Sequence, residues 1–365
     1  ERALAEIVRR HETLRTNFAL RGAQPVLVIH GTADCPLTLR PLPPGLDEDA
    51  AIAALVADEA GRCFDLENGR LIQAALVPLS CGHLFLLTMH HIVSDGWSLD
   101  VLVRELTTLY GAFRRGQPSP LAPLPLQYAD VAQWQRNRLQ GDFLAGEIAY
   151  WRTKLAGIPE VLALPTDRPR PPVQTYRGAS VAGVLDAGLT RDLRELGQSA
   201  GTTLYMTLLA GFAVLLGRYS ALSDVVVGTP VANRPRTEME GLIGLFINTL
   251  AVRVDLSGDP TVRTVLDRVR RTGMEALEHQ ELPFEQLVEE LRPARALSYS
   301  PLVQVSFQLR APTERIEAAG LTLIPVEQEE TSAKFDLSLT VQERAADLAV
   351  FWNYNPGLFD EATIL

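Results

Sequence analysis

A proline-rich stretch divides this 365-residue chain into two parts of similar make-up. Residues 164–177 carry four prolines among mostly polar side chains. Because proline fixes φ and has no backbone N–H, such a stretch neither continues a helix nor pairs inside a sheet. We therefore predict an N-terminal lobe over 1–163, a linker over 164–177 and a C-terminal lobe over 178–365.

Helices and strands are expected in both lobes. Short apolar runs or alternating patterns predict strands at 24–30, 71–79, 83–91, 179–185, 224–232, 248–255, 303–310, 336–342 and 347–354. Helical spacing of apolar residues predicts helices at 1–16, 48–63, 99–115, 143–156, 190–200, 203–217, 260–278 and 283–291. The two types cluster unevenly instead of alternating, which indicates an α+β fold with two lobes.

Composition excludes several classes of function. The net charge of −10 argues against a nucleic-acid or polybasic membrane surface. Cys35, Cys63 and Cys81 are odd in number and widely spaced, which excludes a disulfide framework and favours the reducing cytoplasm. The apolar stretch Leu204–Gly217 is shorter than the roughly 20 residues of a bilayer crossing and predicts a buried core helix. No phosphate-cradling glycine motif is present.

Both ends of the sequence lie inside expected helices. Glu1 stands within a helical pattern, and Asp360 reads as an N-cap followed by a single helical turn. We therefore expect the sequence to be a segment of a longer protein.

The segment MHHIVSDGWS is the strongest candidate for a site. His90 and His91 end an apolar run, and Asp95 and Gly96 follow. On a strand, His90 and His91 would point to opposite faces and hold different roles. An imidazole, with a pKa of about 6.5, can accept and return a proton near neutral pH. Asp95 could orient it or hold the loop, and Gly96 permits a tight turn and an N–H close to a reacting oxygen.

Two other interpretations of this segment stay open. The histidines could simply end a strand at the surface, with Asp95-Gly96 making a turn. The four residue types at this spacing should coincide by chance in roughly one chain per thousand, which favours a catalytic site. A metal site is disfavoured because His90 and His91 are adjacent and no third ligand stands nearby.

Five motifs occur in an order that resembles the condensation domains of nonribosomal peptide synthetases. That family shares a fold with chloramphenicol acetyltransferase. The matching segments are RRHETLRTNF (9–18), MHHIVSDGWS (89–98), YADVAQWQ (128–135), IGLFINTLAVR (243–253) and HQELPFE (279–285). The family's first motif is missing, and Ser300 stands where its last motif often has Asn. The resemblance implies two chloramphenicol acetyltransferase-like lobes in a V-shaped pseudo-dimer with a tunnel between them.

The resemblance also assigns roles to the site residues. His91 would be the catalytic imidazole, and His90 would serve packing and hydrogen bonding. Asp95 would pair with an arginine of the second lobe, at Arg234, and so hold the loop of Gly96 in place. A carboxylate–guanidinium pair is geometrically specific enough for this purpose. The alternative for Arg234 is a solvated loop arginine.

Three further residues are candidates for lining the substrate tunnel. These are Trp97, Ser98 and Asn248. Trp97 could instead be a packing residue. Asn248 could equally end a strand and satisfy backbone groups.

The resemblance implies amide-bond formation between two carrier-bound substrates. An upstream peptidyl carrier protein would present an acyl or peptidyl thioester, and a downstream one an aminoacyl thioester, both on 4'-phosphopantetheine arms. The domain itself would bind no cofactor or metal, and an adenylation domain would adjoin it. Alternatives are an epimerisation domain, a stand-alone acyltransferase, and an inactive recruitment platform, although platforms usually lose the histidine motif. Heterocyclisation is disfavoured by His90 and His91, and an L-configured donor is expected.

Overall fold

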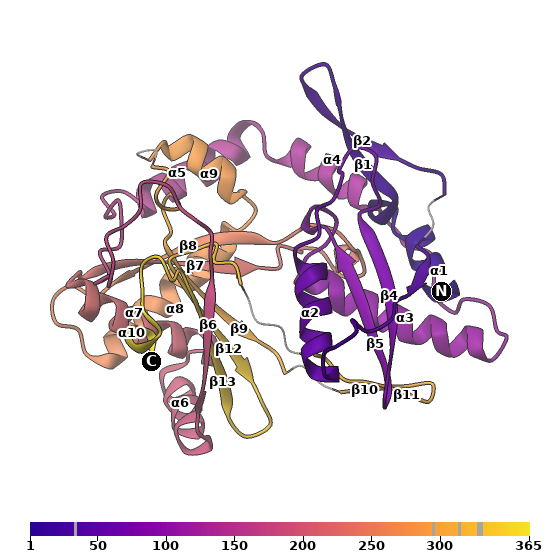
Figure 1. Ribbon diagram of the computed structural model, residues 1–365. Helices are drawn as coiled ribbons and strands as arrows, with labels where there is room; N and C mark the ends of the chain where they lie inside the picture. Colours follow the sequence, from indigo (N-terminus) through magenta and orange to yellow (C-terminus); the bar gives the residue numbers. More distant parts are fainter. Residues whose placement is uncertain (33–34, 294–295, 313–314, 327–330) are drawn as a thin grey trace. The chain divides into compact units, whose positions relative to one another are not determined.

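The computed structural model describes residues 1–32, 35–293, 296–312, 315–326 and 331–365 (Figure 1). The predicted α+β class is confirmed, since helices and strands are mixed throughout. The chain forms two compact units. Unit 1 comprises Glu1–Arg138, Arg234–Ile247 and Arg315–Pro325, and unit 2 comprises Leu139–Asn233, Asn248–Glu314 and Val326–Leu365.

Unit 1 is built around a three-stranded sheet with the strand order β3-β4-β5. Its strands and packed helices are β3 (Leu37–Leu39), β4 (Ile72–Leu79), β5 (Gly82–Met89), α2 (Glu48–Ala60) and α3 (Gly96–Arg114). β3 runs parallel to β4, whereas β4 and β5 form the antiparallel hairpin that the sequence predicts.

The helices α2 and α3 cover opposite faces of this sheet. Successive side chains of a strand point to opposite faces, so β4 contributes residues to the core on both sides. Ala75 of β4 packs in one core cluster with Leu55 of α2. Ile72 of the same strand belongs to another cluster, with Leu102 of α3. The short connection 90–95 between β5 and α3 carries the candidate site.

Smaller elements complete unit 1. They are α1 (Arg2–Arg10), the hairpin of β1 (Thr16–Arg21) and β2 (Gln24–Ile29), α4 (Tyr128–Arg138), the hairpin of β10 (Ile316–Ala318) and β11 (Leu321–Leu323), and 3-10 turns at Glu12–Arg15, His91–Val93 and Thr237–Met239. Two of these elements lie in segments 234–247 and 315–325, which belong to unit 1 although much of unit 2 precedes them in the sequence.

Unit 2 contains a six-stranded sheet with the order β6-β13-β12-β9-β7-β8. The strands are β6 (Ala179–Leu185), β7 (Asp224–Val231), β8 (Asn248–Asp255), β9 (Val305–Arg310), β12 (Leu337–Glu343) and β13 (Leu348–Tyr354). The helices are α5 (Gly141–Lys154), α6 (Ala187–Ala200), α7 (Leu204–Ser220), α8 (Val262–Glu278), α9 (Phe284–Leu291) and α10 (Glu361–Ile364). α7 contributes Leu209 and Phe212 to the core, which confirms the predicted buried helix.

Most predicted elements are present within a few residues of their expected bounds. The largest difference is at the N-terminus, where the helix predicted over 1–16 ends at Arg10 and a 3-10 turn leads directly into β1. The helix α4, the strand β1 and the short strands β3, β10 and β11 were not expected. Such short strands carry too few residues for a periodic pattern to stand out.

The proline-rich stretch 164–177 lies within unit 2, and the two units change over after Arg138 instead. It is tied to the rest of unit 2 by hydrogen bonds, for example from Asp167 N–H to Leu358 O (2.9 Å). Arg170 also donates to both carboxylate oxygens of Asp336, at 2.9 and 2.6 Å. The stretch 164–177 thus forms no helix or regular strand, but hydrogen bonds hold it to the rest of unit 2.

Within the described ranges, no single helix is long and apolar enough to cross a membrane; α6 and α7 meet that test only as a pair, bent by 103°. The acidic cluster Glu327, Glu329 and Glu330, for which the sequence predicts a solvated loop or edge, lies outside the described residues.

Candidate active site

His90 lies just beyond β5, which ends at Met89. Its N–H donates to Leu71 O (3.0 Å), and its Nδ1 accepts from the Ile92 N–H (3.0 Å). Its ring meets the ring of Phe64 edge-on, with centroids 5.7 Å apart. The contacts of His90 are therefore those of packing and hydrogen bonding. The predicted alternation of His90 and His91 along a strand does not apply, because the strand has already ended.

His91 begins the 3-10 turn His91–Val93 and is exposed to solvent. Its Nδ1 lies 2.6 Å from the carbonyl oxygen of Ser94. A carbonyl oxygen can only accept, so this contact places the proton on Nδ1. The lone pair of a neutral His91 is then on Nε2. Val93, fully buried in the core under the same turn, fixes the turn to unit 1.

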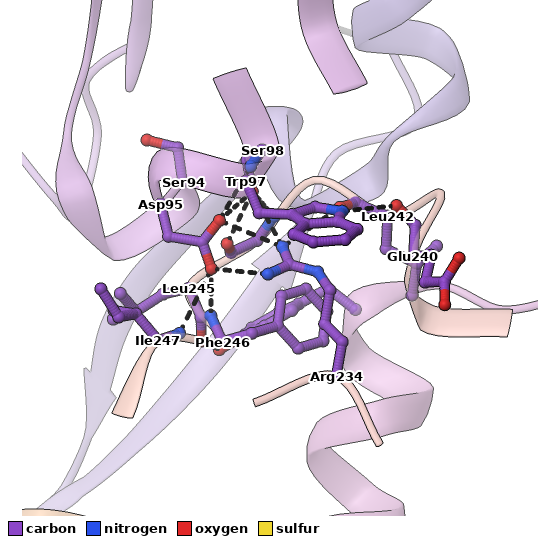
Figure 2. Close-up of polar contacts among 12 residues, drawn as sticks. Ser94, Asp95, Trp97, Ser98, Arg234, Glu240, Leu242, Leu245, Phe246 and Ile247 are labelled. Carbon is purple, nitrogen blue, oxygen red and sulfur yellow. Dashed lines mark hydrogen bonds and ion pairs between the residues drawn. The ribbon is translucent and has the colours of Figure 1, made fainter. Parts of the chain in front are cut away.

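Asp95 is the N-cap of α3 and is buried, with 4% of its surface exposed. Its Oδ1 accepts from the Ser98 N–H (2.9 Å), which is the usual hydrogen bond of an N-cap carboxylate. Arg234 binds it through two guanidinium N–H groups, at 3.0 and 3.1 Å. The N–H groups of Phe246 and Ile247 reach Oδ2 at 3.0 and 3.2 Å (Figure 2). Five N–H groups thus converge on one carboxylate.

This environment keeps Asp95 ionised. Burial acts to raise the pKa of Asp95, but the hydrogen bonds and charge of Arg234, with the hydrogen bonds of Ser98 and Phe246, outweigh it and lower the pKa below its ordinary value. Arg234 is equally enclosed: its guanidinium lies 4.1 Å from the ring centroid of Phe246 and 5.6 Å from that of Trp97.

The predicted pair of Asp95 and Arg234 is thus present, but it lies within unit 1. The expectation that Arg234 reaches Asp95 from a second lobe differs from this arrangement, because the segment Arg234–Ile247 is itself part of unit 1. The interpretation of Arg234 as a solvated loop arginine is wrong, since both side chains of the pair are only 2% exposed.

The segment 242–247 is held along its backbone by side chains from several motifs. The Ile243 N–H donates to His11 Nδ1 (3.3 Å), and the Gly244 N–H lies 3.1 Å from Ser98 Oγ. Tyr128 OH donates to Leu245 O (2.9 Å). Together with the bonds of Asp95, these contacts join residues of four of the five motifs in one hydrogen-bonded network.

His11 is in turn fixed by a buried carboxylate. Its Nε2 lies 3.0 Å from Glu105 of α3, which also binds Arg10 at 3.0 and 3.2 Å. Burial acts to raise the pKa of Glu105, but the hydrogen bonds from His11 and Arg10 lower it overall. Arg10 and His11 of the RRHETLRTNF motif therefore tie the end of α1 to α3, and His11 also contacts the backbone of Ile243.

Gly244 is required by close packing. A Cβ on this residue would overlap the ring of Tyr128, which itself meets the Phe246 ring edge-on at 5.1 Å. Gly96 is different: a Cβ there would meet nothing within 4 Å, and its φ is not positive. The tight turn that a glycine would permit at Gly96 is therefore not used, and the fold of unit 1 leaves open space beside this residue.

The two tunnel candidates of unit 1 differ in exposure. Trp97 is 42% exposed, and its Nε1–H donates to Glu240 O (2.9 Å). Ser98 is fully buried, and its Oγ contacts Asp95 Oδ1 (2.7 Å) and Gly244 O (2.9 Å). Ser98 thus has no surface left for a substrate and acts in the buried network around Asp95.

The third candidate, Asn248, lies at the start of β8 in unit 2. Its Nδ2 donates to Gln280 O and Leu282 O, both at 2.8 Å. Its Oδ1 accepts from the N–H groups of Thr249 (2.9 Å) and Phe284 (3.0 Å). All the hydrogen-bonding capacity of the amide is used, so Asn248 is the strand-end residue that satisfies backbone groups. It also caps α9, whose own N-cap is Pro283.

The HQELPFE segment has a structural explanation in unit 2. His279 Nδ1 lies 2.9 Å from Glu147 of α5, and its carbonyl accepts from Trp151 Nε1–H (3.0 Å). The residues that follow contact the Asn248 amide through the carbonyl oxygens of Gln280 and Leu282 and the N–H of Phe284. Within the part of the chain that the structure describes, no group of three or more His, Cys, Asp or Glu side chains is arranged to hold a metal ion.

Sequence reasoning from the residues alone missed Tyr128, His11, Glu105 and the backbone of segment 242–247. Tyr128 lies in the motif YADVAQWQ and His11 in RRHETLRTNF, so membership of a motif could have indicated a role for both. Glu105 and the backbone groups give no such signal, because a helix glutamate reads as solvated and a backbone N–H has no residue type.

Comparisons with known proteins agree with this series of motifs. The family described as "Condensation domain" matches residues 1–365. The chain is 49% identical over 370 residues to a component of the linear gramicidin synthase of Brevibacillus parabrevis, and 47% identical over 369 residues to chondramide synthase cmdD of Chondromyces crocatus. Each alignment covers 100% of this chain but only 5% and 9%, respectively, of those proteins.

A solved structure shares both fold and sequence. The X-domain from teicoplanin biosynthesis, determined in complex with OxyB, is 35% identical, with a TM-score of 0.87. The match covers 100% of this chain and 81% of that chain.

Proposed function

This chain belongs to the condensation domain family, and we propose that it forms an amide bond between two carrier-bound substrates. The observation that carries the proposal is His91, an exposed imidazole whose Nδ1 is held by Ser94 O so that Nε2 is free to accept a proton. Its relatives over the full length of the chain are synthases.

The reaction moves one proton in two transfers and exchanges a C–S bond for a C–N bond. The downstream aminoacyl amine attacks the carbonyl carbon of the upstream acyl or peptidyl thioester. A C–N bond forms and the C–S bond breaks. The proton lost by the amine passes to Nε2 of His91 and from there to the departing thiolate. The products are a lengthened peptide on the downstream carrier and a free thiol on the upstream one.

His91 serves this reaction by position as much as by basicity. A thioester is already activated, so alignment of amine and carbonyl supplies much of the rate. General acid–base catalysis by a placed side chain contributes about 10²- to 10⁴-fold. Asp95 takes no proton in this scheme. Its five N–H partners anchor the end of the 91–95 loop to α3, Arg234 and segment 246–247, while the carbonyl of Ser94 in this loop holds the His91 ring.

Substrates and neighbours follow from the same family membership. We infer that upstream and downstream peptidyl carrier proteins deliver both substrates on 4'-phosphopantetheine, with an L-configured donor, and that an adenylation domain adjoins this chain. Three free cysteines, Cys35, Cys63 and Cys81, favour the reducing cytoplasm.

Condensation on paired carriers tests the proposal. A donor carrier and an acceptor carrier are loaded with aminoacyl groups and mixed with the wild-type chain or with His91→Ala. We expect dipeptide on the acceptor carrier with the wild type, and a rate lower by about 10²- to 10⁴-fold with the variant. Intact-mass spectrometry of the carriers gives the readout. An unchanged rate in folded His91→Ala would overturn the role of His91, and transfer to a free amine alone would indicate a stand-alone acyltransferase.

A recruitment platform is the second candidate function. The observation that favours it is the similarity to an X-domain solved in complex with OxyB. The intact His91 geometry disfavours it. A wild-type chain that leaves both loaded carriers unchanged would support a platform, whereas dipeptide formation excludes an inactive one.

A further inference from the structure

Unit 1 contains a concave pocket of about 370 Å³ on the α2 face of its sheet. Its polar lining is formed by Arg40, Arg62, Arg70, Glu59, Thr38 and Gln73. We call it the Arg40–Arg62–Arg70 pocket. No step of the mechanism above uses it.

Glu59 at the end of α2 orients two of the arginines. It is 8% exposed and accepts from Arg62 Nε (2.9 Å) and Nη2 (2.6 Å), and from Arg40. Thr88 of β5 also donates to it (2.9 Å). The hydrogen bonds from Arg62 lower the pKa of Glu59 although burial opposes them, so the carboxylate stays charged and holds both guanidiniums. The arginines are therefore preorganised, which reduces the entropy lost on binding a ligand.

The pocket is positively charged in an acidic protein. Three arginines line the pocket, and they pair with two carboxylates: the buried Glu59, which binds Arg40 and Arg62, and the exposed Asp58, 3.1 Å from Arg40. The local excess of one positive charge contrasts with the net charge of −10 of the whole chain. Arg70 is exposed and, in the described ranges, forms no ion pair. Several guanidinium donors beside the polar side chains of Thr38 and Gln73 suit an anion with several acceptor oxygens, and a phosphate is the anion that matches this donor set.

The pocket lies on the strand pair that leads to His91. Gln73 of β4 pairs with Thr88 of β5, and Thr88 precedes His91 by three residues, which is at most about 10 Å of chain. In a phosphopantetheine arm, about a dozen bonds separate the phosphorus from the sulfur. Extended like a polypeptide, such a chain spans about 15 Å. A phosphate bound in this pocket is therefore within one arm's length of His91.

We propose that the Arg40–Arg62–Arg70 pocket binds the phosphate of a phosphopantetheine arm. The proposal rests on the proposed function, since it assumes a carrier-bound substrate. Arg70 contributes a charge that is unpaired among the described residues, and the guanidiniums held by Glu59 supply fixed donors.

The test compares thioesters with and without the phosphate. Aminoacyl thioesters of phosphopantetheine and of pantetheine are supplied in turn as donor and as acceptor, with the other substrate on its carrier. For one of the two sides, we expect the wild type to show a KM about tenfold lower for the phosphorylated thioester, and Arg70→Gln to lose most of this preference. Arg70→Lys keeps the charge and should keep most of the preference. Arg21→Gln, at an exposed arginine of β1, is the matched control and should leave it unchanged.

Two results would overturn the proposal. One is equal KM values for the two thioesters on both sides with the wild type, and the other is an unchanged preference in Arg70→Gln. Calorimetric titration with free phosphopantetheine and pantetheine separates this outcome from failure of the proposed function. If the wild type makes no dipeptide yet binds only the phosphorylated arm, and Arg70→Gln does not, the pocket stands while the condensation activity fails.

Discussion

The two ends of the HHIVSDG motif have opposite environments. His91 is exposed, and its side chain has one polar contact within the described part of the chain, from Nδ1 to Ser94 O. Asp95 is buried and receives five N–H groups from α3, Arg234 and segment 246–247. The difference teaches that one motif combines two tasks. The end with unused hydrogen-bonding capacity is available for chemistry, and the saturated end holds the loop.

Removal of the Asp95 carboxylate should have the largest effect on stability. Asp95→Ala leaves the buried guanidinium of Arg234 and two backbone N–H groups without their acceptor. Loss of one partner of a buried pair costs about 3–5 kcal/mol, so we expect mostly insoluble or unfolded protein. Asp95→Asn, which keeps the shape, should lose folded yield to a smaller extent. Soluble yield and thermal melting measure both; a variant with normal melting and a purely catalytic defect would contradict the structural role.

Two glycines sharpen the same comparison. Gly244→Ala forces a Cβ into the ring of Tyr128, and such overpacking typically costs about 1–3 kcal/mol. Gly96→Ala adds a Cβ to open space at the start of α3, so its stability should change by less than about 0.5 kcal/mol. Chemical denaturation of the two variants is the measurement. If Gly96→Ala proved as destabilising as Gly244→Ala, the geometry of the loop described above would be wrong.

Low pH should destabilise the protein by protonating the buried carboxylates of Asp95 and Glu105. The pKa values of Asp95 and Glu105 are lowered in the folded state, so each carboxylate contributes stability that is present above its unfolded pKa of about 4. That contribution is lost as the pH falls through the lower, folded pKa. The free energy of unfolding should therefore decline below about pH 4, and the decline should be shallower in Asp95→Asn, where one carboxylate no longer titrates. Equal slopes in wild type and variant would contradict the assignment.

The sequence predicts local elements well and the assembly of the site less well. The β4–β5 hairpin and most of α3 follow from short-range patterns, but the helix was expected only from Leu99, and the role of Asp95 as its N-cap was not predicted. The resemblance supplied the pair of Asp95 and Arg234. No pattern shows that segments 234–247 and 315–325 join unit 1, because this depends on contacts far apart in the chain.

The proline-rich stretch and two tunnel candidates illustrate why the remaining predictions differ from the structure. Residues 164–177 look like a linker because proline prevents regular structure, yet side-chain bonds such as that of Arg170 to Asp336 anchor them in unit 2. Ser98 and Asn248 carry polar side chains in motif positions, which suggested substrate contact. Other groups of the protein instead occupy the donors and acceptors of both side chains, and the sequence pattern does not show these partners.

The most direct test of the central claim compares the two ends of the motif in one assay. Dipeptide formation on the acceptor carrier is measured by intact-mass spectrometry for the wild type, His91→Ala and Asp95→Asn, with each rate divided by the folded fraction from melting. We predict that His91→Ala melts like the wild type and loses about 10²- to 10⁴-fold in rate, whereas Asp95→Asn loses mainly folded fraction. A His91→Ala variant that condenses at the wild-type rate would contradict the account.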